Sequence, residues 1–229
     1  MAKVRVSPGR LTVTVSGLIE SEDDIRAGVK AVRRKCPAIR RLHDMLGDPP
    51  LRRRPAGFEG LSRIIVAQQL SVASAAAIWT RVETAVAPFA PDSLLSLNDE
   101  TLRGCGLSAG KVRTLRNIAR AVEADELQIE SLGALTDTEI HEQLTRVSGI
   151  GPWTADIFLM FCLGRRDAFA AGDLALQVAT EAAFGLDGRP TAAELLEIAE
   201  RWRPWRGIAA RLLWAYIPLL KKQREGLPV

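Results

Sequence analysis

The stretch from Leu144 to Ala155, Leu-Thr-Arg-Val-Ser-Gly-Ile-Gly-Pro-Trp-Thr-Ala, constrains the fold of this chain more than any other. A helix-like run over residues 138–147 meets Gly149 and Gly151, which let the backbone turn sharply. Pro152 then stands at or near the first turn of a second helix, where its missing N–H costs nothing. The pattern predicts two helices joined by a tight turn.

The same glycines leave backbone N–H groups bare at a helix N-terminus, where free donors and the helix dipole favour an anion. This indicates a main-chain grip on phosphate, made around Gly149, Ile150 and Gly151. The alternative is an ordinary helix–turn–helix corner with glycine at a C-cap, and Gly-x-Gly alone does not exclude it.

Asp173 lies 20 residues after Trp153 and precedes an apolar, helix-like run to Phe184. One interpretation is a plain N-cap, because aspartate is a preferred cap residue. The other is a functional carboxylate at a helix start, where the dipole and the amides keep it ionised. We expect Asp173 to be the catalytic group if the chain is an enzyme.

Composition sets broad limits on function. The chain has 229 residues, 47% of them hydrophobic and 25% charged, which is enough for a packed core. Its net charge of +4 permits a polyanionic partner without requiring one. The 3 cysteines are far apart and form no Cys-x-x-Cys, so no iron–sulfur cluster, zinc finger or catalytic cofactor is expected.

Location can also be anticipated. No apolar run approaches the length of a membrane span, and residues 1–10 lack the apolar core of a signal peptide. Reading the cysteines as reduced, we expect an intracellular protein, in a cytoplasm or a nucleus, without a membrane partner.

Nearly every element that the patterns indicate is helical, so the predicted fold class is all-α. Helix starts are expected at Ser21, Ser71 and Ser108, because each serine can cap the residues that follow. A further helix is predicted over Phe58–Gln69. At the N-terminus, residues 4–6 and 11–15 read either as a small β-hairpin or as a frayed extension.

Four segments in chain order resemble one family, and with the flanking helices they span residues 37–222. They are Ile65–Ser71, Gly106–Leu115, the hairpin with Asp173, and the tract Trp202–Trp214. Together they resemble the helix-hairpin-helix (HhH-GPD) DNA glycosylase superfamily, and the last tract resembles its 3-methyladenine DNA glycosylase II (AlkA-type) branch.

The resemblance implies two helical lobes with a cleft between them. Residues 1–36 would be an N-terminal extension and 37–229 the glycosylase core. The central lobe would cover about 70–170, and the N- and C-terminal helices would form the other lobe. Most of the β-domain that precedes the core in fuller members would be missing.

The resemblance also assigns roles to residues. Asp173 would be the catalytic carboxylate, and Trp153 and Trp214 would form the wall of a base pocket. DNA would be contacted by the hairpin and by a loop whose plug residue fills the gap left by a flipped base, the plug being Gln69, or Leu70 if the register slips. The full set of expected DNA contacts is Gln68, Gln69, Leu70, Gly149, Ile150, Gly151 and Thr154.

Backbone carbonyls of Thr145, Val147 and Ile150 would hold a structural Na⁺ or K⁺ ion next to the phosphate. Members with lyase activity carry lysine where this chain has Trp153, so the resemblance implies a glycosylase without lyase activity. Two positions depart from the family pattern. Ile157 stands where an aromatic residue is usual, and Ala171 and Gly172 replace acidic neighbours of Asp173.

The expected function is therefore a monomeric DNA repair enzyme that flips and excises alkylated purines, such as 3-methyladenine and 7-methylguanine, from double-stranded DNA. A glycosylase for deaminated or oxidised bases is the alternative among enzymes. A non-catalytic module that uses the hairpin only to hold phosphates is the alternative outside them.

Overall fold

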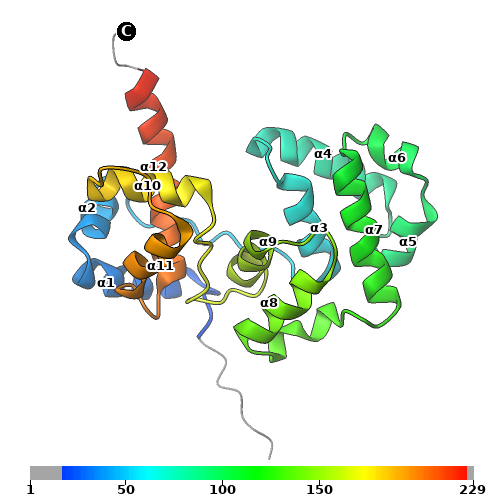
Figure 1. The fold of residues 1–229 in the computed structure, drawn as a ribbon, viewed down its shortest axis with the longest axis horizontal. Coiled ribbons are helices and arrows are strands. Elements are labelled where there is room, and N and C mark those ends of the chain that lie inside the picture. Colours follow the sequence, from blue (N-terminus) through cyan, green and yellow to red (C-terminus); the bar gives the residue numbers. More distant parts are fainter. Residues whose placement is uncertain (1–16, 226–229) are drawn as a thin grey trace, which may run out of the picture.

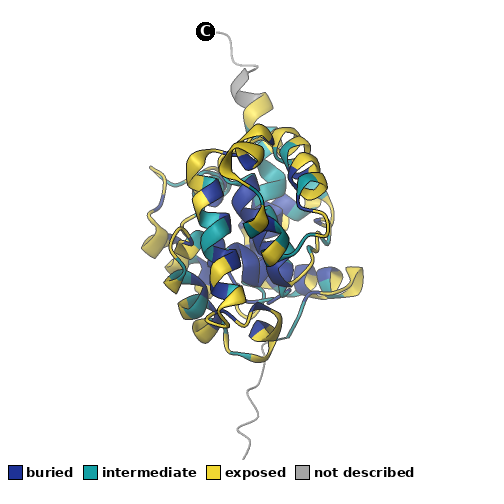
Figure 2. Cartoon of the chain, turned by 90° about the vertical axis from the view of Figure 1, so that its right-hand side faces the viewer, coloured by how far each residue is buried: buried dark blue, intermediate teal, exposed yellow. Residues whose placement is uncertain are grey.

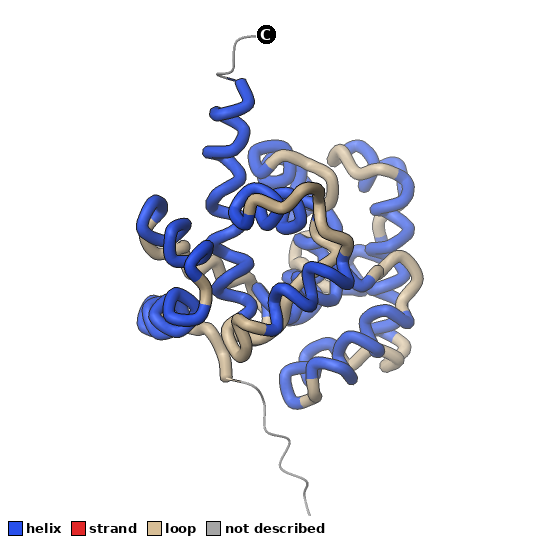
Figure 3. Tube along the Cα trace, turned by 60° about the vertical axis from the view of Figure 1, so that its left-hand side comes forward, coloured by secondary structure: helices blue, strands red, loops and turns tan. Residues whose placement is uncertain are grey.

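The computed structural model describes residues 17–225, with side chains through Lys222. In this range the chain is helical, with one isolated antiparallel bridge between Leu18 and Arg165 and no strand (Figure 3). The predicted all-α class is confirmed, and the N-terminal β-hairpin falls outside the described residues.

The elements are α1 (Glu22–Lys35), α2 (Pro37–Leu46), α3 (Gly57–Ala67), α4 (Val72–Ala85), α5 (Pro91–Ser96), α6 (Asp99–Gly104), α7 (Ala109–Glu123), η1 (Ile129–Ala134), α8 (Asp137–Arg146), α9 (Pro152–Ile157), η2 (Phe158–Cys162), α10 (Leu174–Phe184), α11 (Ala192–Glu200) and α12 (Arg206–Glu225).

The helices form two lobes (Figure 1). One lobe contains helices from both ends of the described chain. In it, α12 packs along α1, α2 and α10, and α11 packs on α10. The other lobe holds α3–α8, with α9 and its continuation η2 packed on α3. Helix α3, which begins at Gly57, packs on α4 and α7 of this second lobe, and α1 packs on α2 and α12 of the first.

Local sequence signals account for where several helices begin. The hydroxyl of Ser21 accepts a hydrogen bond from the Asp24 amide, and the Asp24 carboxylate accepts one from the Ser21 amide. The two bonds together form a capping box. Ser71 and Ser108 cap α4 and α7 in the same way, through the amides of Ser74 and Lys111. The three predicted caps are therefore present.

Helix α3 is buried on most sides and packs against α4, α7, α9, η1 and η2. Figure 2 shows that buried residues face the interior of the molecule and exposed residues cover its outside. The apolar α3 residues Leu61, Ile64, Ile65 and Val66 are each at most 1% exposed. The helix ends at Ala67, two residues before the predicted end, so Gln68 and Gln69 belong to the loop that leads to α4.

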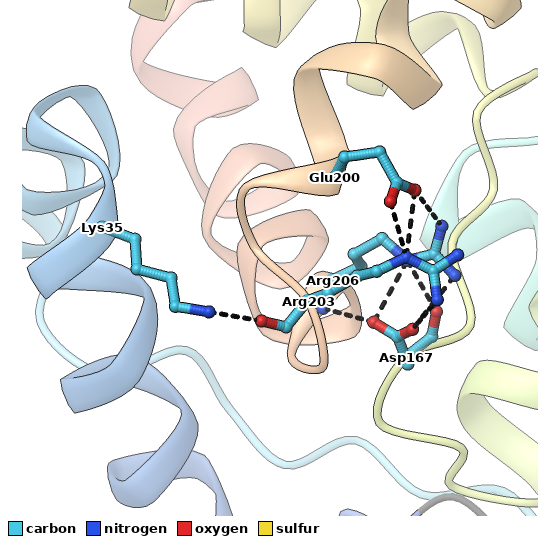
Figure 4. A network of polar contacts seen from close by, with 5 residues as sticks. All are labelled: Lys35, Asp167, Glu200, Arg203 and Arg206. Carbon is cyan, nitrogen blue, oxygen red and sulfur yellow. Dashed lines mark hydrogen bonds and ion pairs between the residues drawn. The ribbon is translucent and has the colours of Figure 1, made fainter.

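A buried carboxylate attaches the loop between η2 and α10 to the start of α12 (Figure 4). Asp167 is 8% exposed, and its two oxygens pair with Arg206 at 3.1 and 3.2 Å and with Arg203 at 3.0 Å. Glu200 pairs with both arginines from the solvent side, and Lys35 donates to the Arg203 carbonyl at 2.6 Å. Removing one partner of a buried pair costs about 3–5 kcal/mol, so this network holds the loop that leads to Asp173.

No helix among the described residues is both long enough and apolar enough to span a membrane.

Candidate active site and DNA interface

Asp173 is the point where three elements meet. It caps α10, since its Oδ1 accepts the Leu176 amide at 2.9 Å. The indole of Trp153 on α9 donates to its Oδ2 at 2.7 Å, and the indole of Trp214 on α12 donates to its Oδ1 at 3.0 Å. The carboxylate is half-buried, and its neighbours Gly172 and Leu174 are exposed. Both expected roles therefore coincide: the residue is a cap and also a solvent-reaching carboxylate held by two further donors.

The structure brings Trp153 and Trp214 to one carboxylate, because both indole N–H groups donate to Asp173. Their role as the wall of a base pocket stays a prediction. Phe161 of η2 adds a third ring, with its centroid 5.6 Å from that of Trp214. Sequence analysis missed Phe161, because an aromatic residue inside the apolar run 157–163 gives no local sign of its partner on α12. Ile157, where the family has an aromatic residue, is 6% exposed and packs in the core.

The hairpin between α8 and α9 forms where the glycine pattern predicted it. Gly149 has a φ of +98°, and a Cβ at this position would collide with Thr114 of α7. The Ile150 side chain is 5% exposed and anchors the turn, and its amide donates to the Val147 carbonyl at 3.0 Å. Gly151 is exposed with a φ of −97°, and a Cβ there would meet nothing within 4 Å. The fold thus explains Gly149 but not Gly151.

The loop between α3 and α4 presents the expected plug residue. Gln69 is exposed and has a φ of +56°, a left-handed conformation that costs a non-glycine residue about 1–3 kcal/mol. Leu70 is 39% exposed and Val72 is 88% exposed beside it. The strain and exposure favour Gln69 over Leu70 as the protruding residue.

Of the expected DNA contacts, Thr154 is buried and Gln68 is only partly exposed. Thr154 is 1% exposed, and its hydroxyl accepts from the Gln68 amide at 2.9 Å. Burial leaves Thr154 no free face for DNA, so the structure assigns the pair an internal role that ties the plug loop to the hairpin.

One face of α7 supports both the loop between α3 and α4 and the hairpin between α8 and α9. The Lys111 ammonium donates to the Val66 and Gln68 carbonyls at 2.7 and 2.8 Å, and partial burial lowers the pKa of this lysine. Asn117 donates to the Ser148 carbonyl at 3.0 Å. Residues 111, 114 and 117 are successive positions of an i, i+3 row, which places them on the same side of the helix. Lys111 lies in the segment Gly106–Leu115, which resembles the family, but the sequence of that segment does not predict which carbonyls its ammonium binds.

Comparison with known proteins identifies the family to which this chain is similar. The family model of the HhH-GPD superfamily of base excision DNA repair proteins matches residues 62–204. The DNA-3-methyladenine glycosylase 1 of Schizosaccharomyces pombe is 33% identical over 161 residues, covering 69% of this chain and 71% of that protein. The alkylbase DNA glycosidase-like protein mag2 of the same yeast is 30% identical over 175 residues, covering 74% and 82%.

Two solved structures agree with this. The S. pombe 3-methyladenine DNA glycosylase Mag1, in complex with abasic DNA, superposes with a TM-score of 0.77 at 29% identity, covering 82% of this chain and 95% of that chain. A DNA-3-methyladenine glycosidase from Bacillus halodurans gives a TM-score of 0.73 at 31% identity, covering 86% and 91%. The chain belongs to the HhH-GPD superfamily, which confirms the resemblance drawn from its motifs.

The two hairpin glycines offer a matched pair of substitutions. Gly149→Ala should lower the free energy of unfolding by about 1–3 kcal/mol, because alanine is strained at positive φ and meets Thr114. Gly151→Ala should change it by less than about 0.5 kcal/mol, because its Cβ meets open space. Urea unfolding of the two variants measures both values, and equal losses would contradict this account of the turn.

Asp156 on α9 should make stability depend on pH. Burial raises the pKa of its carboxyl from the ordinary 3.8 to about 7, against the opposing effect of Arg206, and His141 lies 3.8 Å away. The folded state therefore keeps a proton between about pH 4 and pH 7 that the unfolded state has lost. Stability from this group is greatest at the acidic end and falls as pH rises through 7, by about 1.4 kcal/mol per unit of pKa shift.

The substitution Asp156→Asn should flatten that fall and make the protein more stable than wild type at pH 8. Unfolding midpoints measured from pH 4 to pH 8 test this. His141→Gln serves as the control for the histidine whose ring lies 3.8 Å from the Asp156 carboxylate. An identical pH profile for wild type and Asp156→Asn would refute the assignment.

Proposed function

We propose that this protein is a monofunctional DNA glycosylase that flips alkylated purines, such as 3-methyladenine and 7-methylguanine, out of double-stranded DNA and hydrolyses their N-glycosidic bonds. The observation that carries the proposal is Asp173, a half-exposed carboxylate fixed by two indole N–H groups and one amide. Its family and its relatives, which are named for 3-methyladenine and alkylated bases, support the reaction and the substrate class. The site of action would be wherever chromosomal DNA lies, a nucleoid or a nucleus.

The chemistry follows from the charge of Asp173. When the bond between C1′ and the base breaks, positive charge builds on the sugar, and a fixed carboxylate stabilises it. Three N–H donors from α9, α10 and α12 keep the carboxylate from moving toward that charge or away from it. A water molecule then adds to C1′, its proton leaves, and an abasic site remains. A purine that is cationic from alkylation leaves readily, so no second acid is required.

Flipping a base out of the duplex costs a few kcal/mol, which the DNA-facing elements must offset. Gln69, held in a strained and exposed position, would occupy the gap in the stack. The amides of Gly149 and Gly151 donate no hydrogen bond within the described residues, so both remain available for phosphate. The open space beside Gly151 would let the DNA backbone approach, which explains a glycine that the fold itself does not need.

Lyase activity requires an amine that can attack the sugar, and the site provides none at position 153. The Trp153 indole donates to Asp173 instead. Lys111, the lysine that supports the plug loop, is committed to two backbone carbonyls. We therefore expect base release without strand cleavage.

A monovalent cation beside the hairpin also fits this chain. The carbonyls of Thr145 and Val147 lie at the end of α8, where helix carbonyls carry partial negative charge, and the Val147 carbonyl also accepts the Ile150 amide. Together with the Ile150 carbonyl they would supply hard oxygen ligands for Na⁺ or K⁺ and add positive charge next to a phosphate. Replacing K⁺ by tetramethylammonium at constant ionic strength should weaken DNA binding, and equal affinity in the two salts would remove this part of the proposal.

Asp173→Asn should abolish most base release while keeping the fold. Asparagine caps a helix as well as aspartate does, but it lacks the charge that stabilises the sugar cation. We expect release of 7-methylguanine from methylated duplex DNA to fall by about 100- to 1,000-fold, with DNA affinity and unfolding midpoint near those of wild type.

Asp173→Ser is the matched control, because serine also keeps the α10 cap without a charge, and it should lose activity to a similar extent. Treatment of the wild-type reaction with borohydride should trap no protein–DNA adduct. If wild type releases no base and all three proteins bind DNA equally, the chain is a non-catalytic binding module.

A further inference from the structure

Arg211 on α12 is a buried cation without a carboxylate partner among the described residues. It is 4% exposed, and its guanidinium donates only to the carbonyls of Gly207 and Met160, at 3.1 and 3.2 Å, while its Nε has no partner. Burial, and then the nearby Arg53 and Arg52, lower the pKa of Arg211 to about 10, so it stays charged at neutral pH. A buried charge with only carbonyl partners is costly, and the fold offers no ion pair to offset it.

This charge lies directly behind the aromatic part of the site. The guanidinium carbon of Arg211 is 4.7 Å from the centroid of the Phe161 ring, over its face. Phe161 in turn packs on Trp214, whose indole donates to Asp173. Arg211 and Trp214 are three residues apart on α12 and so share one side of the helix. A base held against these rings would therefore have Asp173 near its sugar and Arg211 behind the ring wall.

We propose that Arg211 is a specificity-determining residue, whose fixed charge raises the excision of electrically neutral alkylated purines relative to cationic ones. The inference rests on the proposed function, because it assigns a direction to the charge selectivity of that same pocket. It concerns bases such as 1,N6-ethenoadenine, which carries no charge, against 7-methylguanine, which does.

The expected selectivity follows from the charge that moves onto the leaving purine. In both substrates the bond between C1′ and N9 breaks, its electron pair moves onto the purine, and the oxygen of water bonds to C1′ while its proton passes to solvent. A cation behind the purine stabilises that shift equally for both bases. The bases differ before the reaction, since a cationic purine is repelled on entry and already uses the face of aromatic rings as a cation–π partner. A neutral purine therefore gains the full stabilisation of its leaving group, whereas for a cationic purine the repulsion on binding offsets part of that stabilisation.

The test places both lesions in one reaction, so that the fraction of folded protein cancels from the ratio. Arg211→Met removes the charge but keeps much of the side-chain length, and Arg211→Gln removes it while keeping donors for the two carbonyls. For both variants we expect the ratio of kcat/KM for ethenoadenine over 7-methylguanine to fall by about tenfold. Arg211→Lys, which keeps the charge, should stay within about twofold of wild type.

The rate of base release in single turnover distinguishes an effect of the Arg211 charge from an effect of lost side-chain packing. At saturating enzyme in single turnover, loss of the charge should slow the two lesions by similar factors, so that the change in selectivity appears in binding. A wild type that releases both lesions, with the same ratio in Arg211→Met and Arg211→Gln, overturns this inference and leaves the proposed function standing. A wild type that releases neither lesion overturns the proposed function itself.

Discussion

The structure depends on one carboxylate with donors from three elements. Asp173 receives an indole N–H from α9, another from α12 and an amide from its own helix α10. α9 packs on the central lobe, while α10 and α12 belong to the other lobe, so these bonds also join the two lobes. A carboxylate that reacts with developing positive charge must not relax toward it, and donors from separate rigid helices prevent that more effectively than neighbours along one segment.

The same principle organises the DNA-facing parts. The hairpin and the plug loop are irregular segments, yet each is attached to a helix face rather than left to its own conformation. Lys111 binds the carbonyls at the end of α3, Asn117 binds the hairpin, and Gln68 connects the loop to Thr154. Because α7 supports both segments, the distance between the Gln69 loop and the hairpin is set by one helix. In the proposed function, that fixed distance would let the protein act on one nucleotide while it holds the neighbouring phosphate.

Much of this could be predicted from sequence, because the decisive signals are local. Helix caps, the Gly-Ile-Gly turn and an aspartate before an apolar run each depend on a few adjacent residues, and all appear where expected. Contacts between distant segments gave no such signal. Phe161 and Arg211 are separated by 50 residues and meet only because η2 packs near α12. Thr154 was misplaced for the same reason: its position beside the hairpin is local, but its burial depends on Gln68, 86 residues away.

The two glycines of the hairpin show how function can be separated from folding within one motif. Gly149 is required by its positive φ and by Thr114, and these constraints would hold in any protein with this corner. At Gly151 a Cβ would meet nothing within 4 Å, so no steric constraint among the described residues requires glycine there. A residue that costs backbone entropy and gives the fold nothing in return is best explained by something outside it. Arg211 and Gln69 follow the same pattern, since a buried cation with no carboxylate partner among the described residues and a non-glycine residue at positive φ both cost free energy in the free protein.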